Sequence, residues 1–563
     1  MNAEEHFGIK PYGATPTYRQ IEHLKLGRKA FFHFGVNTFS NMEWGDGTER
    51  ESLFNPTDID VRSWIRDIKA AGFELAIITA KHHDGFCLWP SKYTEHSVKN
   101  SPYKNGEGDI IREFTDACHE YNMKVGIYVS PWDRNSPYWG SPEYSEFYAK
   151  QLEEILTGYG KIDEIWWDGA GSLEAKYDWG RWAYLIRKHQ PDAVIFGSMG
   201  AYPYAEMRWV GNEAGFAGLT HYASINRDMI EQEIVEHMNA GIIGGELYIP
   251  AEVDVSIRPG WFYHEDQDDK VKSSRALDKI WFRSVGNNAI MLLNFPPDRR
   301  GKLVRTDVKN AIESYQRISR MLSVNLLAGA SLTADSSYCA DTGIDKAAAA
   351  DYDLYYASGA DRSEAVVDIA LESSTRANTL IIGEMVELGE RITSYKLESI
   401  EGNTVSLLAE GTSVGFKRAI RFTEGDYSHL RLAVSGIVAP ITLNTLSLHL
   451  YEADENDSTN SQDKPNLARL SSASVEISED RKSAVILFGG IYPFDSIAFV
   501  STNHMGARYE IFAFDGSKYY SIAEGKADDY NINVKLDSLV ETSYQVKIVS
   551  DSRFAIDPDF NIH

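Results

Sequence analysis

The chain has 563 residues, of which 43% are hydrophobic and 25% charged, a composition that excludes collagen-like, coiled-coil and mainly disordered proteins. At roughly 150 residues per domain, this length predicts about three domains. The 56 basic and 82 acidic residues give a net charge of −26, which argues against nucleic acid or an anionic membrane surface as a partner.

No segment of the sequence predicts membrane insertion or export. No apolar run approaches the ~18 residues of a membrane span, and the first residues, MNAEEHFGIKPYG, have neither a basic nor an apolar signal region. A protein whose signal peptide has been removed would look the same, so a cytoplasmic, periplasmic or extracellular location stays open. Cys87, Cys118 and Cys339 form no CxxC motif, which argues against a zinc ribbon or a disulfide framework.

Residues 1–325 alternate short apolar runs with longer amphipathic segments, the pattern of βα units and a parallel sheet. Helices are expected between the strands, the clearest over Asp58–Ala71 with Asp60 as N-cap, and a further helix is expected near Lys302–Leu322. Eight strands predict a (β/α)8 barrel rather than an open doubly wound sheet, because no Gly-rich phosphate fingerprint follows the first strand. The predicted strands are Ala30–Asn37, Glu74–His83, Lys124–Trp132, Ile162–Ala170, Ala193–Ser198, Met207–Glu213, Glu246–Asp254 and Ala289–Pro296.

After the barrel the sequence changes to short alternating strands separated by Gly, Asn, Asp and Ser, which is typical of β-sandwiches. The polar stretch 454–465 is the best candidate for a linker. We therefore expect three domains: the barrel over 1–325, a β-sandwich over 326–455 and a second β-sandwich module over 466–563. The first sandwich is expected to include strands at Glu364–Leu371, Thr379–Gly383, Ser394–Glu398, Arg418–Phe422, Leu430–Val434 and Leu446–Tyr451.

Polar residues at the carboxyl ends of barrel strands indicate function, because the active sites of such barrels lie there. Asp168 directly follows the apolar run Ile165-Trp166-Trp167, and Glu213 ends a later strand in a Gly-Asn-Glu-Ala-Gly turn. An isolated acid of this kind is often only a helix cap. Two carboxylates from two strand ends, however, fit glycoside hydrolysis, in which one attacks and the other donates a proton.

Three histidines at strand ends have two further interpretations. His33, His82 and His83 could bind a metal ion, but adjacent residues of a strand point to opposite faces and no HxH or HExxH spacing is present. Hydrogen bonding to substrate hydroxyls, or a structural role, fits them better. A serine nucleophile is disfavoured because the strand-to-helix turns contain no GxSxG motif.

Taken together, the runs HFGVNTFSNMEWGDG, KHHDGFCLWPSKYTEHSV, GIYVSPWD, WWDGA and RPGWFYH resemble the glycoside hydrolase family 29 α-L-fucosidases over the barrel, residues 1–320. The resemblance implies a retaining enzyme without cofactor or metal that removes terminal α-L-fucose from an oligosaccharide. It places Asp168 on the family's nucleophile. Residues implied to line the fucose site are His33, Glu43, Trp44, His82, His83, Tyr128, Trp166 and Trp261.

The position of the acid/base varies across this family. The GNEAG turn resembles the subfamily that prefers α-1,3 and α-1,4 linkages in Lewis-type glycans, which makes Glu213 the expected proton donor, with Glu246 and Glu252 as rivals. A retaining pair should lie about 5–5.5 Å apart. Alternatives are a broad-specificity α-1,2/1,6-fucosidase, a metal-dependent hydrolase, and a non-catalytic carbohydrate-binding protein. The oligomeric state and the role of the β modules stay open.

Overall fold

The computed structural model is divided into two compact units, Met1–Val210 with Thr220–Tyr451 and Gly211–Leu219 with Glu452–His563. The structure describes most of the chain up to residue 452 and mainly strands beyond it. The described residues are 7–169, 172, 175–197, 200–231, 235–452, 474–478, 482–487, 494–500, 508–514, 519–526, 531–540, 545–550 and 561–562.

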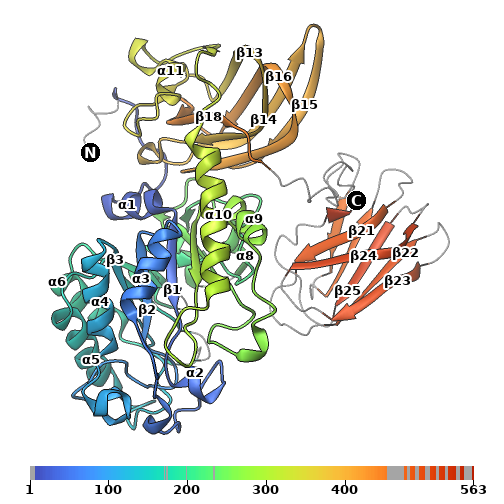
Figure 1. Cartoon of the computed structure of the whole chain (residues 1–563). Coiled ribbons are helices and arrows are strands. Elements are labelled where there is room, and N and C mark those ends of the chain that lie inside the picture. The colour runs from blue at the N-terminus through green and yellow to red at the C-terminus, as the bar shows by residue number, and fades with distance from the viewer. Residues whose placement is uncertain are drawn as a thin grey trace. The chain divides into compact units, whose positions relative to one another are not determined.

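The first unit contains a closed barrel of eight parallel strands in the order β1-β10-β9-β6-β5-β4-β3-β2 (Figure 1). Each predicted barrel strand overlaps an observed one, so the predicted fold class is confirmed. The strands are β1 (Arg28–Phe32), β2 (Leu75–Lys81), β3 (Lys124–Val129), β4 (Glu164–Trp167), β5 (Val194–Gly197), β6 (Met207–Trp209), β9 (Ala251–Ser256) and β10 (Ile290–Asn294).

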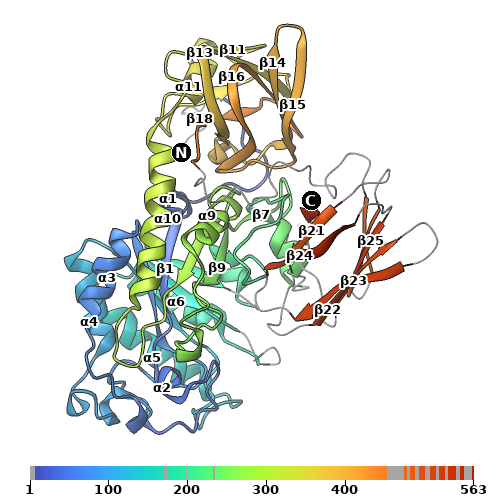
Figure 2. The ribbon, with the colours of Figure 1, turned by 45° about the vertical axis from the view of Figure 1, so that its right-hand side comes forward.

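Helices surround the strands because one face of each helix is apolar. In α3 (Val61–Ala70), Trp64, Ile65 and Ile68 are buried, and the Asp60 side chain accepts a hydrogen bond from the Ser63 N–H as the expected N-cap. The other barrel helices are α4 (Ile110–Glu120), α5 (Tyr144–Gly158), α6 (Trp179–His189), α9 (Ser274–Arg283) and α10 (Arg305–Ser323). Figure 2 shows α10 running along the barrel and on to the β-sandwich.

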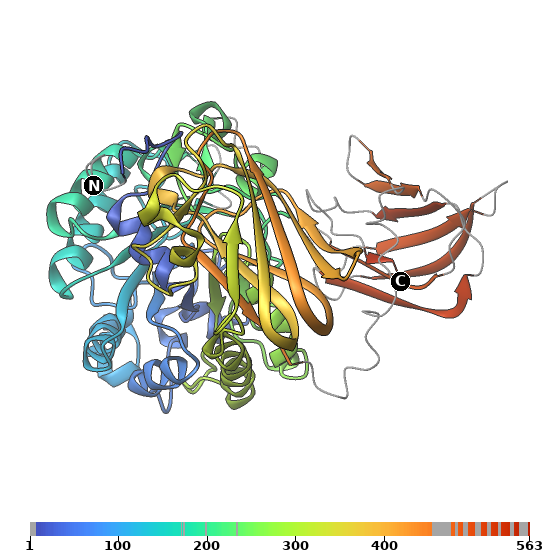
Figure 3. The ribbon, with the colours of Figure 1, turned by 90° about the horizontal axis from the view of Figure 1, so that it is seen from above.

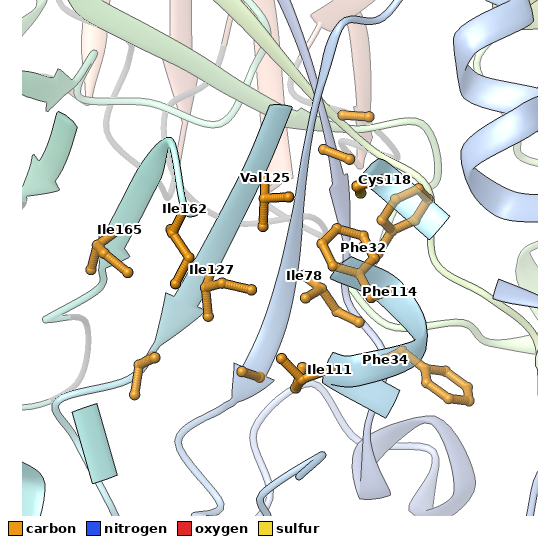
Figure 4. Packing of buried hydrophobic residues seen from close by; sticks show 14 of the residues in the cluster. Phe32, Phe34, Ile78, Ile111, Phe114, Cys118, Val125, Ile127, Ile162 and Ile165 are labelled. Atoms are coloured by element: carbon orange, nitrogen blue, oxygen red, sulfur yellow. The ribbon is translucent and has the colours of Figure 1, made fainter. Parts of the chain in front are cut away.

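Side chains alternate along the strands between the helices and the barrel interior. Phe32, Ile78 and Ile127 pack outward with Phe114 of α4, as Figure 4 shows. Their strand neighbours Phe31, Ile77 and Tyr128 belong instead to the interior cluster. This alternation fixes which residues of each strand reach the functional end of the barrel.

The seventh predicted strand, Glu246–Asp254, is split in the structure. β8 (Leu247–Tyr248) pairs with β7 (Ser224–Ile225) in a short antiparallel sheet, and only β9 belongs to the barrel. Pro250 separates the two strands, since it has no N–H for a sheet hydrogen bond. Between β7 and β8 the chain forms two short helices, α7 (Arg227–Glu231) and α8 (Val235–Ala240).

The structure contains two short helices near the barrel that the sequence did not predict. α1 (Tyr18–Leu26) begins with a capping box between Thr17 and Gln20, and α2 (Val36–Ser40) begins in the loop after β1. Neither has the long apolar periodicity that identifies a helix in a sequence.

A β-sandwich region follows α10. Its six-stranded sheet has the order β11-β13-β16-β14-β15, with β18 paired to β13. The strands expected at 364–371 and 379–383 form one strand, β13 (Glu364–Gly383), and those at 418–422 and 430–434 form β16 (Arg418–Gly436). Register shifts near Ala370 and Ala377 bend the pair where separate strands were predicted. The remaining strands of the sheet are β11 (Ser331–Ala334), β14 (Ile392–Glu401), β15 (Thr404–Gly411) and β18 (Thr445–His449).

This β-sandwich region contacts the end of the barrel at which the strands begin. The backbone N–H of Ala419 donates to Gly286, and the Asn288 side chain donates to Glu390, just before β10 starts. Figure 3 shows the long strands lying over the barrel. The sandwich therefore lies opposite the carboxyl ends of the strands.

The second unit contains two antiparallel sheets beyond residue 473, in the orders β19-β20-β25-β22-β23 and β24-β21-β26. The expected linker at 454–465 lies outside the described residues. Among the described residues, no helix is long and apolar enough to cross a membrane. The strands are β19 (Ser474–Ile477), β20 (Ser483–Leu487), β21 (Phe494–Val500), β22 (Arg508–Phe514), β23 (Tyr519–Lys526), β24 (Asn531–Val540), β25 (Gln545–Ser550) and β26 (Asn561–Ile562).

Candidate active site

The carboxyl ends of β2, β3 and β4 bring three polar side chains together. Asp168 directly follows β4, and its Oδ2 accepts a hydrogen bond of 3.1 Å from the Tyr128 hydroxyl in β3. The His83 Nε2 atom, beyond β2, lies 3.5 Å from the same oxygen. Burial, followed by the charge of Asp168 and the hydrogen bond to it, raises the pKa of Tyr128 well above its usual value. Tyr128 therefore stays a neutral donor that orients the carboxylate.

His83 is held in place by the strand beside it. Its Nδ1 lies 2.8 Å from the Ser130 hydroxyl, which donates in turn to the Trp132 carbonyl at 2.7 Å. Since that hydroxyl has only one proton, Nδ1 of His83 must be the donor to Ser130. His83 is 1% exposed, whereas Asp168 is 22% exposed, so the carboxylate is accessible while its neighbour is buried.

His33 is a neutral imidazole with one defined tautomer. Its Nδ1 and backbone N–H both donate to the Asn294 amide oxygen, at 2.9 and 3.1 Å, and the Asn294 amide nitrogen donates to the Trp261 carbonyl. Burial lowers the pKa of His33 to about 3, against smaller opposing effects of Asn294 and Asp168. Its Nε2 is then a hydrogen-bond acceptor suited to a sugar hydroxyl.

His82 lies between His33 and Tyr128. Its ring is nearly parallel to that of Tyr128 at 5.7 Å and roughly perpendicular to that of His33, also at 5.7 Å. Phe262 closes another side with a perpendicular contact at 5.0 Å. Burial, then the neighbouring histidines, lowers the pKa of His82 well below its usual value. The strand ends thus carry His33, His82 and Tyr128 as neutral hydrogen-bonding groups near the Asp168 carboxylate.

Glu43 joins two loops beside this cluster. Its Oε2 accepts from the Trp261 N–H at 2.8 Å, and its Oε1 lies 2.5 Å from His264 Nε2. The Trp261 ring packs on His33 at 5.0 Å. Because Glu43 is 40% exposed, it can also present a carboxylate oxygen to a ligand.

The two remaining predicted residues occupy different depths. Trp44 is 46% exposed and meets the His83 ring edge-on at 5.5 Å. Trp166 is 5% exposed, stacks on Phe196 at 3.8 Å and lies in the barrel interior beside Tyr128, its partner in the strand register. Since Trp166 lies on β4, two residues before Asp168, it packs in the interior next to the site.

Glu213 lies on a tight turn of its own. Gly211 and Gly215 have φ of 92° and 86°, a conformation that favours glycine. Between them, Asn212 accepts from the Ala214 N–H and donates to the Phe216 carbonyl. Glu213 is half-buried. Since the segment Gly211–Leu219 groups with the second unit and Asp168 with the first, the 5–5.5 Å separation of the two carboxylates stays a prediction.

The rival acids have other environments. Glu252 is fully buried, where it accepts from Lys29 and, at 3.1 Å, from the Trp166 indole. Glu246 precedes β8 outside the barrel and accepts from the Arg227 N–H. Neither lies at the carboxyl end of a barrel strand.

Sequence reasoning missed Asn294, Ser130 and His264. Asn294 and Ser130 lie at the carboxyl ends of β10 and β3. Asp168 was identified because polar residues at the carboxyl ends of barrel strands indicate function, and the same reasoning could have identified these two. His264 contacts Glu43 across 221 residues, and no local pattern predicts such a pair. Among the described residues, no group of three His, Cys, Asp or Glu side chains is arranged to hold a metal ion.

Known proteins of one family match this chain over the barrel and beyond it. Residues 6–325 match the family model "Alpha-L-fucosidase". The chain is 39% identical to alpha-L-fucosidase 1 of Arabidopsis thaliana over 425 residues, which cover 73% of this chain and 82% of the plant protein.

Solved structures agree with these matches. A Ruminococcus gnavus GH29 fucosidase in complex with fucose is 31% identical, with a TM-score of 0.73, over 78% of this chain and 96% of that one. A glycoside hydrolase 29 family member from an unknown rumen bacterium is 29% identical, with a TM-score of 0.72, over 98% of this chain and 100% of that one. This chain belongs to the α-L-fucosidase family, glycoside hydrolase family 29.

Proposed function

We propose that the protein is a retaining α-L-fucosidase that removes terminal fucose from α-1,3- and α-1,4-fucosylated, Lewis-type oligosaccharides. The observation that carries the proposal is the Asp168 carboxylate at the end of β4, which accepts from the Tyr128 hydroxyl and lies near His83 and the neutral His33 and His82. These rings offer both donors and acceptors, as the hydroxyl groups of a sugar require. A cluster that converges on one accessible carboxylate suits nucleophilic attack at an anomeric carbon.

In the proposed mechanism Asp168 attacks the anomeric carbon while Glu213 protonates the leaving oxygen. Glu213 then acts as base on the water that releases fucose. Two observations favour Glu213 over its rivals: Glu252 is fully buried against Lys29, and Glu246 lies outside the barrel. The α-1,3/1,4 preference rests on the resemblance of the GNEAG turn.

Linkage is tested by hydrolysis of a panel of α-1,2-, α-1,3-, α-1,4- and α-1,6-fucosylated oligosaccharides. We expect kcat/KM to be at least about tenfold higher for the Lewis-type substrates. Equal or faster cleavage of the α-1,2 or α-1,6 substrates would favour the broad-specificity alternative. Binding without cleavage of any substrate would favour the carbohydrate-binding alternative.

The role of Glu213 is tested by Glu213→Gln. An aryl fucoside with a good leaving group needs little protonation, so the first step should proceed and the glycosyl-enzyme should accumulate as a burst. Azide, which needs no base, should restore turnover. Rescue by azide in Glu246→Gln or Glu252→Gln, but not in Glu213→Gln, would assign the acid/base role to one of those residues.

A further inference from the structure

Two loops at the carboxyl ends of the strands are joined beside His83. The Arg134 guanidinium, in the loop after β3, donates to the Gly45 carbonyl at 2.7 Å, and the Asn135 amide donates to the Gly47 carbonyl at 2.8 Å. The Arg134 backbone N–H also donates to the His83 carbonyl at 2.9 Å. The loop after β1 and the loop after β3 therefore have a fixed relation to each other and to the candidate nucleophile.

These loops carry two perpendicular tryptophans. Trp44 and Trp132 meet edge to face at 5.5 Å and 89°. Trp132 also packs on the His83 ring at 4.9 Å, and the Arg134 guanidinium lies 5.3 Å from the centre of its ring. Trp44 is 46% exposed and Trp132 is partly exposed, in contrast to the buried His83 beneath them. The proposed chemistry at Asp168 assigns no task to Trp132 or Arg134.

A buried ion pair fixes the loop that holds Trp132. Lys81 donates to the Asp133 carboxylate at 2.9 Å, and both side chains are almost completely buried. The other Asp133 oxygen accepts from the backbone N–H groups of Asn135 and Ser136. The backbone at Gly85 packs closely against this carboxylate, since a Cβ there would lie 2.3 Å from an Asp133 oxygen. Such a buried pair favours one loop conformation, and Trp132 is therefore held in position before any ligand binds.

We propose that Trp132, together with Arg134, binds the sugar unit to which fucose is attached, and so contributes to the choice of substrate. The proposal rests on the proposed function. His33, His82, His83 and Tyr128 are at most 7% exposed, whereas Asp168, Glu43 and Trp44 are 22%, 40% and 46% exposed, so a ligand at Asp168 reaches solvent past the loops that carry Glu43 and Trp44. A sugar attached to a fucose at Asp168 can extend over Trp44 and Trp132, which lie beside His83. An indole ring packs against the C–H face of a pyranose, and a guanidinium donates to its hydroxyls.

The test compares substrates with and without a sugar leaving group. For Trp132→Ala we expect kcat/KM on a Lewis-type trisaccharide to fall about 10- to 100-fold, mainly through KM. Turnover of α-L-fucosyl fluoride, whose leaving group is a single atom, should stay within about threefold of the wild type. Trp132→Phe should recover part of the loss on the trisaccharide. Tyr184→Ala, which removes an exposed aromatic ring on α6, is the matched control and should change neither value.

Two outcomes would overturn the proposal. An equal loss on both substrates would mean that Trp132 acts through His83 on the fucose itself, and no loss on the trisaccharide would mean that it contacts no sugar. Failure of the proposed function is seen separately in the wild type, as cleavage of the fluoride without cleavage of the trisaccharide. The same comparison is then made with whichever fucosylated oligosaccharide the wild type does cleave.

Discussion

Glu164 and Asp168 are carboxylic acids at the two ends of one strand, β4, and they differ in burial and in hydrogen-bond partners. Glu164 is fully buried and accepts from Lys29 at 2.7 Å, whereas Asp168 is 22% exposed, accepts from the Tyr128 hydroxyl and lies beside His83. Burial, then the charge of Glu252, raises the pKa of Glu164, while Lys29 opposes this increase. We therefore expect the beginning of the strand to contribute to stability and its end to catalysis, as is common in such barrels.

The largest effect should follow from Asp168→Asn. Since the amide cannot form the covalent intermediate, kcat/KM should fall by at least about 10⁴-fold on every substrate, with little change in thermal stability. Steady-state kinetics and a thermal melt measure the two quantities. A variant that retained more than a few per cent of activity would locate the nucleophile elsewhere.

Lys29→Met, at the other end of the barrel, should lower stability, in contrast to Asp168→Asn, which should lower activity. It leaves Glu164 and Glu252 buried without their cation, which should lower the free energy of unfolding by about 3–5 kcal/mol. Denaturant unfolding measures this loss. Glu164→Gln is the control: it resembles the protonated acid and should cost less. If Lys29→Met were as stable as the wild type, the buried pair would contribute nothing to folding.

A smaller effect on activity is expected from Glu43→Gln. Glutamine keeps the size of the side chain but weakens the contacts with the Trp261 N–H and His264, so the ring that packs on His33 loses part of its support. We expect kcat/KM to fall about 10- to 100-fold. Asp46→Asn, an exposed acid in the same loop, should leave it unchanged; an equal loss in both variants would indicate a general effect of charge in that loop.

The smallest effect concerns the pH dependence of stability. His33 has a pKa of about 3 in the folded protein, so between pH 3 and 6.5 the unfolded chain binds more protons at this position. The contribution of His33 to the free energy of unfolding is therefore fully present above pH 6.5. It is lost as the pH falls from 6.5 toward 3, by up to about 1.4 kcal/mol per pH unit. Unfolding of wild type and His33→Asn at pH 7 and 5 should show a flatter dependence for the variant. Identical slopes would mean that His33 is protonated as readily in the fold as in the unfolded chain.

The sequence predicted the barrel because each strand and helix repeats a local apolar pattern, as in α3 with Trp64, Ile65 and Ile68. Asp168 was identifiable for the same reason, as a charge at the end of an apolar run. Contacts between distant loops were not predictable: Glu43 binds Trp261 across 218 residues. Nor could the sequence distinguish Glu252, whose burial depends on a lysine from another strand, from an acid at the functional end. The long β13 was divided in the prediction because its bend at Ala370–Thr375 resembles a turn.

The central claim, that Asp168 forms a covalent bond to fucose, is tested most directly by trapping that intermediate. A 2-deoxy-2-fluoro-fucosyl fluoride reacts through a good leaving group, while its C2 fluorine slows hydrolysis of the resulting ester, so the intermediate should accumulate. Peptide mapping by mass spectrometry should place one fluorofucosyl group on Asp168, and none in Asp168→Asn. A label on a different carboxylate, or turnover without label that releases the β-anomer of fucose first, would contradict the account.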